Sequence, residues 1–289
     1  MGSPIHFEAP TALEYFATLV ADDASLSVLE AAVAVAQEDL PGVDPQAVLA
    51  EVDALAERLR RRIPADAVPV QKLRLLNRYF FQELGFAGNV NNYYDRRNSY
   101  VPEVLRTRRG IPITLALLYV ELAQQVGLKA CGVSFPGHFL VKVHLPGGEV
   151  VIDPFDGRSL SREALEERLL PYRRRRGAFG DEEVPLGLYL QKAEPRAIVA
   201  RLLRNLKEIH RAARDWQRLL PVLDRLVALL PEDWDERRDR ALVHAELGRL
   251  DDAALDAAAY LRERPQAHDA AGLRSLLDAW RRRGAGRRH

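Results

Sequence analysis

The sequence predicts a mixed α+β domain followed by an all-α domain, and three observations support this division. The segment at 113–126 is apolar nearly all round, which is typical of a buried helix, and three short runs with strand character follow it. After Pro195 only helical patterns remain, and they repeat at a fixed spacing. Finally, 47% hydrophobic and 29% charged residues are ordinary for a globular chain with a sizeable core.

Charge and cysteine content exclude several classes of protein. The 42 Lys and Arg residues nearly balance 41 Asp and Glu residues, so a nucleic-acid partner is not favoured. The arginine runs at 173–176 and 281–288 lack interleaved aromatic residues and are interpreted as solvated segments. One cysteine, Cys131, excludes an intramolecular disulfide and a multi-cysteine metal site. No apolar run approaches the roughly 20 residues of a membrane span, and the N-terminus lacks a secretory pattern, so we expect a cytoplasmic protein without a membrane partner.

The first third of the chain predicts helices. Asp44 and Pro45 form a cap and first turn, and the helix ends before Pro64; its apolar face carries Val48, Val52, Leu55 and Leu59. A second helix ends at Gly85 and carries Leu73, Leu76, Phe80 and Leu84. We assign 1–68 to a helical N-terminal extension and 69–171 to the α+β core.

The stretch between Gly85 and Gly110 is polar, aromatic and too irregular for one long element. Long ordered loops of this kind are often functional. Its candidate ligand-binding residues are Asn89, Asn92, Tyr94, Asp95 and Asn98. Their amides could hold the loop in place, or they could line a site for a peptide or small ligand. The sequence leaves both interpretations open.

The predicted strands are KACGVSF, HFLVKVHL and EVVIDPF, with a turn at Pro146-Gly147-Gly148 between the last two. The region 172–194, with its arginine run, glycines and acidic residues, is predicted to be a linker. A two-residue turn at Gly147-Gly148 would set Asp153 opposite Lys142, whereas a turn centred on Leu145-Pro146, or a bulge, would set it opposite His138. Either register leaves the His138 and Asp153 side chains on one face of the sheet.

Residues 195–283 contain a repeat of 34 residues. That interval separates Pro231 from Pro265, His210 from His244, Leu226 from Tyr260 and Leu219 from Ala253. Helix, short turn, helix and proline at this period resemble the tetratricopeptide repeat, with a capping helix from His268 to Arg283. Lys207 departs from the pattern, because it stands where the next repeat has the small residue Ala241. Residues 284–289 are predicted to be a disordered tail.

The order of elements around His138 resembles the core shared by papain-like and transglutaminase-like proteins. A buried helix is followed by a strand, by a strand that opens with His138, and by a strand that closes with Asp153. In that core a cysteine at the helix N-terminus is the nucleophile, a histidine is its base and an aspartate orients the imidazole. The motifs from 73 to 157, together with the C-terminal repeats, resemble the SirB-type bacterial family, which implies a transglutaminase-like fold joined to tetratricopeptide repeats.

The sequence departs from the active pattern at the nucleophile. A transglutaminase helix opens with glycine, any residue and cysteine, whereas this chain has Gly110-Ile111-Pro112. Proline suits a first helical turn but has no thiol, hydroxyl or amine. Thr114 has no route to activation, and Cys131 lies on the following strand, where a buried apolar role is favoured.

His138 and Asp153 are the candidate catalytic residues, and the alternative is that each serves its local turn. A metal site built from His138, Asp153 and Asp156 would lack a recognised ligand spacing, so we predict neither a metal nor a cofactor. We therefore expect a non-catalytic scaffold whose repeats bind a protein or peptide partner. The alternative is a hydrolase or acyltransferase that uses the His138–Asp153 pair. The oligomeric state is not predicted.

Overall fold

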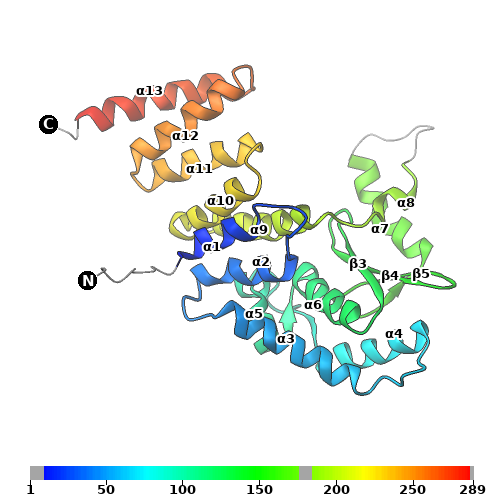
Figure 1. The fold of residues 1–289 in the computed structure, drawn as a ribbon. Helices are drawn as coiled ribbons and strands as arrows, with labels where there is room; N and C mark the ends of the chain where they lie inside the picture. Colours follow the sequence, from blue (N-terminus) through cyan, green and yellow to red (C-terminus); the bar gives the residue numbers. More distant parts are fainter. Residues whose placement is uncertain (1–9, 176–183, 287–289) are drawn as a thin grey trace, which may run out of the picture. The chain divides into compact units, whose positions relative to one another are not determined.

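The computed structural model describes residues 10–175 and 184–286, which form two compact units (Figure 1). The core unit comprises Ser27–Ala36 and the described residues of Leu40–Leu202. The repeat unit takes its described residues from Met1–Leu26, Gln37–Asp39 and Leu203–His289. The division falls inside helix α9 (Pro195–Ala212).

The core unit is helical on both sides of a small antiparallel sheet. Before the sheet it contains α2 (Val28–Val35), which η1 (Ala36–Glu38) follows, α3 (Pro45–Arg60), α4 (Pro69–Asn77), the π-helix η2 (Arg78–Glu83), β1 (Ala87–Gly88), η3 (Arg96–Ser99), α5 (Val101–Thr107), β2 (Arg109–Gly110) and α6 (Pro112–Gln125). The sheet and the elements after it are β3 (Lys129–Val133), β4 (Leu140–Leu145), β5 (Gly148–Ile152), β6 (Ser159–Leu160), α7 (Arg162–Arg175) and α8 (Leu186–Tyr189).

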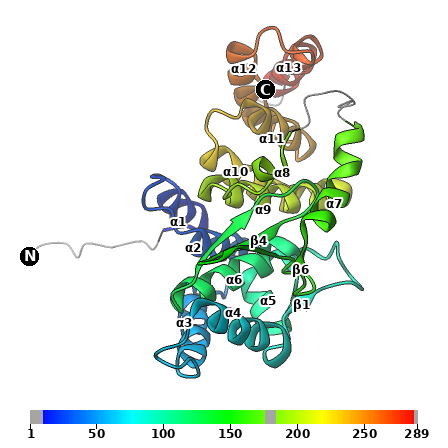
Figure 2. The same cartoon turned by 90° about the vertical axis from the view of Figure 1, so that its right-hand side faces the viewer.

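Helix α6 is the centre of this unit, as its apolar sequence predicts. Pro112 occupies the first helical position, where its missing N–H has no intrahelical partner to lose. The helix contacts strands β3 and β4 and helices α2, α3, α4 and α5 (Figure 2). Leu115, Leu118 and Leu122 are buried in one apolar cluster with residues of α3 and α4. Every residue from Pro112 to Tyr119 is buried, which explains why this part of the helix is almost entirely apolar, whereas Gln124 near its C-terminus is exposed.

The predicted strands are present, and β6 extends the sheet to the order β3-β4-β5-β6. The register differs from both alternatives drawn from the sequence, because Val141 pairs with Ile152 and Leu145 with Gly148. The two-residue turn is therefore Pro146-Gly147. Asp153 follows Ile152 and comes level with Leu140, two residues after His138. This register lies midway between the predicted ones, and an even shift preserves the shared face of His138 and Asp153.

Two stretches are more regular than the sequence suggests. The polar segment after Gly85 contains η3 and helix α5, which ends at Arg108 in a left-handed conformation (φ 59°). In the expected linker at 172–194, α7 continues to Arg175 and α8 follows the undescribed residues. Leu186 and Ala193 are buried in apolar clusters, so the described part of 172–194 packs instead of forming an extended linker. The predicted apolar face of α3, with Val52, Leu55 and Leu59, is buried in the same apolar cluster as α6.

The repeat unit begins with α1 (Ala12–Leu19), which contacts α10 (Trp216–Leu229). It continues with α11 (Trp234–Glu246), α12 (Leu250–Glu263) and α13 (Ala270–Gly286), and successive helices from α10 to α13 contact one another. Residues 284–286, part of the expected disordered tail, continue α13 as helix; the remainder lies outside the described residues.

The same backbone hydrogen bonds recur 34 residues apart. Asp215 N donates to His210 O at 2.9 Å, and Arg249 N donates to His244 O at 2.8 Å. Leu230 N to Leu226 O and Arg264 N to Tyr260 O are both 2.8 Å. The turns also match, because Arg214 and Gly248 both adopt a left-handed conformation (φ 51° and 74°). Glycine adopts this conformation without strain, and the repeat imposes it on the arginine.

Among residues 10–175 and 184–286, no helix combines the length and apolar character needed to cross a lipid bilayer.

Truncating Leu118 to Ala should destabilise the chain by roughly 2–5 kcal/mol, because this side chain is 1% exposed and its loss leaves a cavity around α6. The measurement is the free energy of unfolding in urea, followed by far-UV circular dichroism. Leu188→Ala is the matched control in the same unit, since Leu188 is 61% exposed, and it should cost less than about 0.5 kcal/mol. Equal losses in both variants would contradict a core centred on α6.

Candidate functional site

His138 and Asp153 meet at hydrogen-bond distance in the core unit. Nε2 of His138 lies 2.8 Å from Oδ1 of Asp153, so a protonated Nε2 donates to the carboxylate. The Asp153 side chain is 4% exposed and that of His138 is 23% exposed. The order of helix and strands, and the common sheet face of His138 and Asp153, therefore predicted this contact. The catalytic role of both residues stays a prediction.

Two turns position the pair. His138 follows the turn after β3, where its backbone N–H donates to Phe135 O at 3.0 Å. Asp153 follows β5 and opens the Asp-Pro-Phe-Asp-Gly turn, in which its N–H donates to Arg158 O and its carbonyl accepts from Gly157 N, both at 2.8 Å. These two backbone hydrogen bonds hold the turn from which the Asp153 carboxylate reaches His138.

A third residue, Arg168 on α7, completes the site. Its Nη1 lies 2.8 Å from Oδ2 of Asp153, so the two carboxylate oxygens have different partners. The sequence analysis did not identify Arg168. The signal was available, because Arg168 adjoins Leu169 and lies three residues after Leu165 in a helical stretch, and both leucines are buried. An arginine beside a buried helix face usually has an acidic partner.

Asp153 is held ionised. Burial raises the pKa of its carboxyl, but the hydrogen bond and charge of His138, the Phe155 N–H and Arg168 outweigh burial and lower the pKa below its ordinary value. The Phe155 N–H donates to Oδ1 at 3.0 Å. The pair can thus orient and stabilise a positively charged imidazole, as in a base-and-orienter arrangement.

Backbone pairing links the Asp153 turn to the start of α6. Phe155 O accepts from Gly88 N at 2.7 Å, and Gly88 of β1 pairs with Gly110 of β2. Asn89 N then donates to Gly110 O at 3.0 Å, two residues before Pro112. A Cβ at Gly88 would overlap the ring of Phe155, so only glycine allows this approach.

The start of α6 carries a proline, and the hydroxyl and the thiol nearest to it in sequence are both buried. Pro112 is buried at the first helical position. The hydroxyl of Thr114 is fully buried and directs its proton to Asn98 O at 2.7 Å and Ile111 O at 3.0 Å. Cys131 is buried in β3, opposite Lys142, and burial raises the pKa of its thiol despite the nearby lysine charge. A thiol with a raised pKa forms little thiolate at neutral pH.

The amides of the asparagine-rich segment bond to one another. Asn98 is buried, and its Nδ2 donates to Asn92 O at 2.7 Å and Tyr93 O at 3.1 Å. Asn89 Nδ2 donates to Asn98 Oδ1 at 2.9 Å, and Asn92 N donates to Asn89 Oδ1 at 3.1 Å. Asp95 caps η3 and pairs with Arg97. These contacts fit the loop-holding interpretation. Tyr94, which is 80% exposed, leaves its side chain in solvent, as does the neighbouring Val90, which is 78% exposed.

Within the part of the chain that the structure describes, no three His, Cys, Asp or Glu side chains gather as a metal-binding group. The set His138, Asp153 and Asp156 raised from the sequence is therefore not assembled.

Replacing Asp153 by Asn should destabilise the chain most at neutral pH. The pKa of Asp153 is lowered by folding, so the ionised carboxylate stabilises the fold above its unfolded pKa of about 3.9. That contribution is lost as the pH falls through the lower folded value. At pH 7 the free energy of unfolding should fall by roughly 2–4 kcal/mol, since Arg168 is partly exposed and its loss of a partner is softened by water.

Urea unfolding between pH 3 and 7 measures this difference, which should shrink below about pH 4. Asp156→Asn is the control in the same turn, because Asp156 is 39% exposed and should contribute only about 1 kcal/mol or less. A wild-type advantage that stays constant across this pH range would contradict the role given to the ionised carboxylate.

Comparison with known proteins agrees with this architecture. Residues 46–204 match the transglutaminase-like superfamily, and residues 206–278 match the tetratricopeptide repeat, which confirms both resemblances. The chain is 36% identical over 257 residues to a UPF0162 protein of Xylella fastidiosa, a match that covers 89% of this chain and 90% of the relative.

More distant relatives carry the same name. A UPF0162 protein of Pseudomonas aeruginosa is 31% identical over 221 residues, which cover 76% of this chain and 78% of the relative. The UPF0162 protein YchA of Escherichia coli is 26% identical over 213 residues, covering 73% and 76%. No solved structure gives a significant match. This chain, a transglutaminase-like domain followed by tetratricopeptide repeats, belongs to the bacterial UPF0162 family.

Proposed function

We propose that this protein is a non-catalytic, interaction-mediating member of its family, in which the transglutaminase-like core is a scaffold and the repeats bind a partner protein. The observation that carries the proposal is Pro112 at the start of α6, where an active transglutaminase has its nucleophilic cysteine. Acyl transfer needs an atom that attacks and a proton that the base removes, and proline supplies neither. The proposal includes a cytoplasmic location, where a single buried thiol such as Cys131 needs no oxidised partner.

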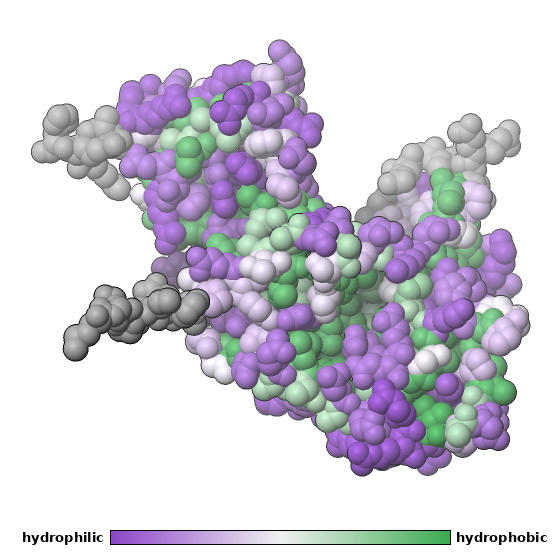
Figure 3. Space-filling model, in the orientation of Figure 1, coloured by the Kyte–Doolittle hydropathy of each residue, from purple (hydrophilic) through white to green (hydrophobic). Residues whose placement is uncertain are grey.

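A groove in the repeat unit supports the second half of the proposal. Its volume is about 550 Å³, in the range of sites that bind ligands or peptide side chains. Two tryptophans, Trp216 and Trp280, line it together with the partly exposed Leu242 and Leu276. Aromatic and aliphatic side chains of this kind are the usual anchors of protein interfaces. Figure 3 shows hydrophobic residues emerging among hydrophilic ones over α11–α13.

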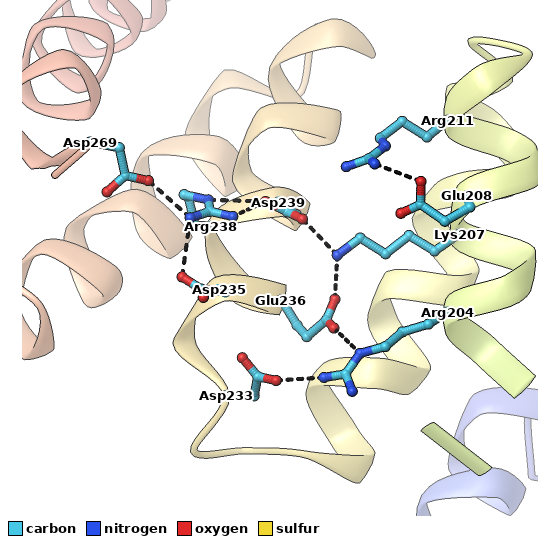
Figure 4. A network of polar contacts seen from close by, with 10 residues as sticks. All are labelled: Arg204, Lys207, Glu208, Arg211, Asp233, Asp235, Glu236, Arg238, Asp239 and Asp269. Atoms are coloured by element: carbon cyan, nitrogen blue, oxygen red, sulfur yellow. Dashed lines mark hydrogen bonds and ion pairs between the residues drawn. The ribbon is translucent and has the colours of Figure 1, made fainter. Parts of the chain in front are cut away.

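A charge network holds one wall of the groove in place (Figure 4). Lys207, the residue that departs from the repeat pattern, projects from α9 and is 7% exposed. Its Nζ lies 2.6 Å from both Glu236 Oε2 and Asp239 Oδ2 of α11. Two acidic partners offset the cost of burying the ammonium group.

The network continues on both sides of Lys207. Arg204 contacts Glu236 at 2.8 Å, and Arg238 contacts Asp239 at 2.7 Å and Asp269 at 2.9 Å. These pairs connect α9, α11 and the segment that leads into α13. A groove whose walls are already fixed loses less conformational entropy when a partner binds.

Leu242→Arg should abolish partner binding, because it introduces a charge into the apolar lining of the groove. The matched control is Leu255→Arg, which makes the same change at a residue of the next helix that is 72% exposed and does not line the groove. Each variant and the unaltered chain would be immobilised and exposed to cytoplasmic extract of the native bacterium, after thermal unfolding has verified the fold. Proteins retained by the unaltered chain and by Leu255→Arg, but lost with Leu242→Arg, support the proposal. Identical retention by all three contradicts it.

A hydrolase or acyltransferase is the second candidate function. The observation in its favour is the intact His138–Asp153–Arg168 arrangement, which is more elaborate than a local turn requires. Such a reaction would use water, or Cys131 after a rearrangement that brings its thiol to His138. The buried thiol and its raised pKa argue against the second route.

Iodoacetamide labelling distinguishes the two candidates. Cys131 should react slowly in the folded chain at pH 7 and rapidly in urea, since burial raises the pKa of its thiol. In a Cys131→Ser background, Pro112→Cys should react faster than Cys131 does, because a helix N-terminus and His138 favour the thiolate.

Adding His138→Ala to the Pro112→Cys, Cys131→Ser double variant should slow the labelling again. The Cys131→Ser variant has no cysteine and gives the background labelling. Rapid labelling of Cys131 in the unaltered chain would favour the hydrolase or acyltransferase. A cysteine at position 112 that is no more reactive than Cys131 would contradict the correspondence between position 112 and the transglutaminase nucleophile, and with it the proposal.

A further inference from the structure

A second cavity, which we call the Arg201 pocket, lies in the core unit and has a volume of about 350 Å³. Its lining includes Ser134, Phe135, Gly137, Tyr172, Tyr189 and Arg201. These residues come from the turn before His138, from α7, from α8 and from the first half of α9. The pocket contains none of the residues of the repeat groove and does not involve Pro112.

The guanidinium of Arg201 is half-buried and uses one nitrogen to hold the turn. Its Nη1 donates to Ser134 Oγ at 2.7 Å and to Phe135 O at 3.2 Å. The group also lies 5.5 Å from the ring centre of Phe139, a cation–π distance. Nε and Nη2 donate to no acceptor in the described part of the chain, although a guanidinium has five N–H donors.

Within residues 10–175 and 184–286, no carboxylate pairs with Arg201. Burial lowers the pKa of Arg201, and the nearby ionisable groups that oppose this effect are Tyr172 and Tyr93, which are neutral at pH 7. Other enclosed arginines are paired: Arg240 contacts Asp256 at 2.7 Å and Asp224 at 3.0 Å. A desolvated charge without a counter-ion is costly, so the arrangement around Arg201 favours an anion supplied from outside the chain.

We infer that the Arg201 pocket binds the carboxylate group of a ligand. The planar guanidinium fork matches a carboxylate in geometry, and Ser134, Tyr172 and Tyr189 add hydroxyl groups around it. Arg201 is the only charged side chain of the pocket lining in the described chain, and one positive charge balances a carboxylate better than a phosphate of nearly two negative charges. The aromatic walls can cover the apolar part of the same ligand.

The pocket adjoins the His138–Asp153 pair. Gly137 lines it and immediately precedes His138. Tyr93 is close enough to both sites that the charges of Arg201 and Asp153 each affect the pKa of its hydroxyl, which burial raises. A ligand carboxylate bound by Arg201 would therefore hold the rest of the ligand close to His138.

Isothermal titration calorimetry on the full-length protein tests the inference with chemically matched probes. N-acetylphenylalanine presents a chain-terminal carboxylate, and N-acetylphenylalanine amide is the same molecule without the charge. The α-amide of N-acetylglutamate presents a side-chain carboxylate. Benzoate represents a free small acid, and inorganic phosphate represents the competing anion. The tightest of the three carboxylates identifies the source of the ligand group.

We expect saturable binding of at least one carboxylate and none of the amide. Arg201→Gln should weaken that binding by about 30-fold or more, the equivalent of about 2 kcal/mol for a lost charge pair. Arg196→Gln, on the same helix but outside the pocket, removes the same charge and should bind as the unaltered chain does. Arg201→Lys should bind the carboxylate more tightly than Arg201→Gln does and more weakly than the unaltered chain. If Arg201→Gln fails to fold, the affinity of Arg201→Lys is compared with that of the unaltered chain instead.

Four results would overturn the inference. The first is the absence of saturable binding of every carboxylate to the unaltered chain. The second is equal affinity for N-acetylphenylalanine and its amide, and the third is tighter binding of phosphate than of any carboxylate. Unchanged carboxylate affinity in a folded Arg201→Gln variant would count in the same way.

Discussion

The buried carboxylate of Asp153 is the constraint on which the core unit depends. A carboxylate that is 4% exposed must find donors inside the protein, and it finds them on three separate elements. His138 comes from the turn before β4, Arg168 from α7 and the Phe155 N–H from the turn after β5. The carbonyl of Phe155 then accepts from Gly88 beside β2. One anion thus fixes the positions of the hairpin, the following helix and the entry to α6.

This constraint gives the His138–Asp153 geometry a role in the fold that does not depend on a reaction. In an active thiol enzyme the histidine and aspartate serve the reaction, but here the same two residues also satisfy each other's buried polar atoms. Removing either partner would leave an unmatched group, so the arrangement has a structural value independent of catalysis. Pro112 fits the same logic, because it begins a buried helix without an N–H that would need an acceptor.

The repeat unit also contains a buried charge, the ammonium group of Lys207, and compensates it with ion pairs. Hydrogen bonds at its helix ends recur 34 residues apart. At one pair of equivalent positions, however, the first repeat has Lys207 and the second has Ala241. Ala241 packs in the apolar cluster of α12 and α13, whereas Lys207 requires Glu236 and Asp239 to compensate its charge. The exchange of a small residue for a paired lysine introduces a charge into the lining of the groove and connects two helices at the same point.

The sequence by itself determined the elements whose residues repeat or alternate. The apolar run at 113–126 predicted α6, the spacing of 34 predicted the repeat helices, and the shared face of His138 and Asp153 predicted that they could meet, because periodicity is a local property of the chain. The sequence also identified Pro112 as a departure from the pattern of glycine, any residue and cysteine that opens this helix in a transglutaminase.

Only the tertiary structure decided the rest. The hairpin register fell between the two predicted alternatives, because the choice of turn residues depends on packing of the whole sheet. Arg168 lies 15 residues after Asp153 and Arg201 lies 67 residues after Ser134, each on a helix, and the packing of that helix decides what its arginine contacts. Whether an arginine in such a helix is solvated, paired or open to a ligand depends on which carboxylates folding brings within reach, and that is a property of the assembled chain.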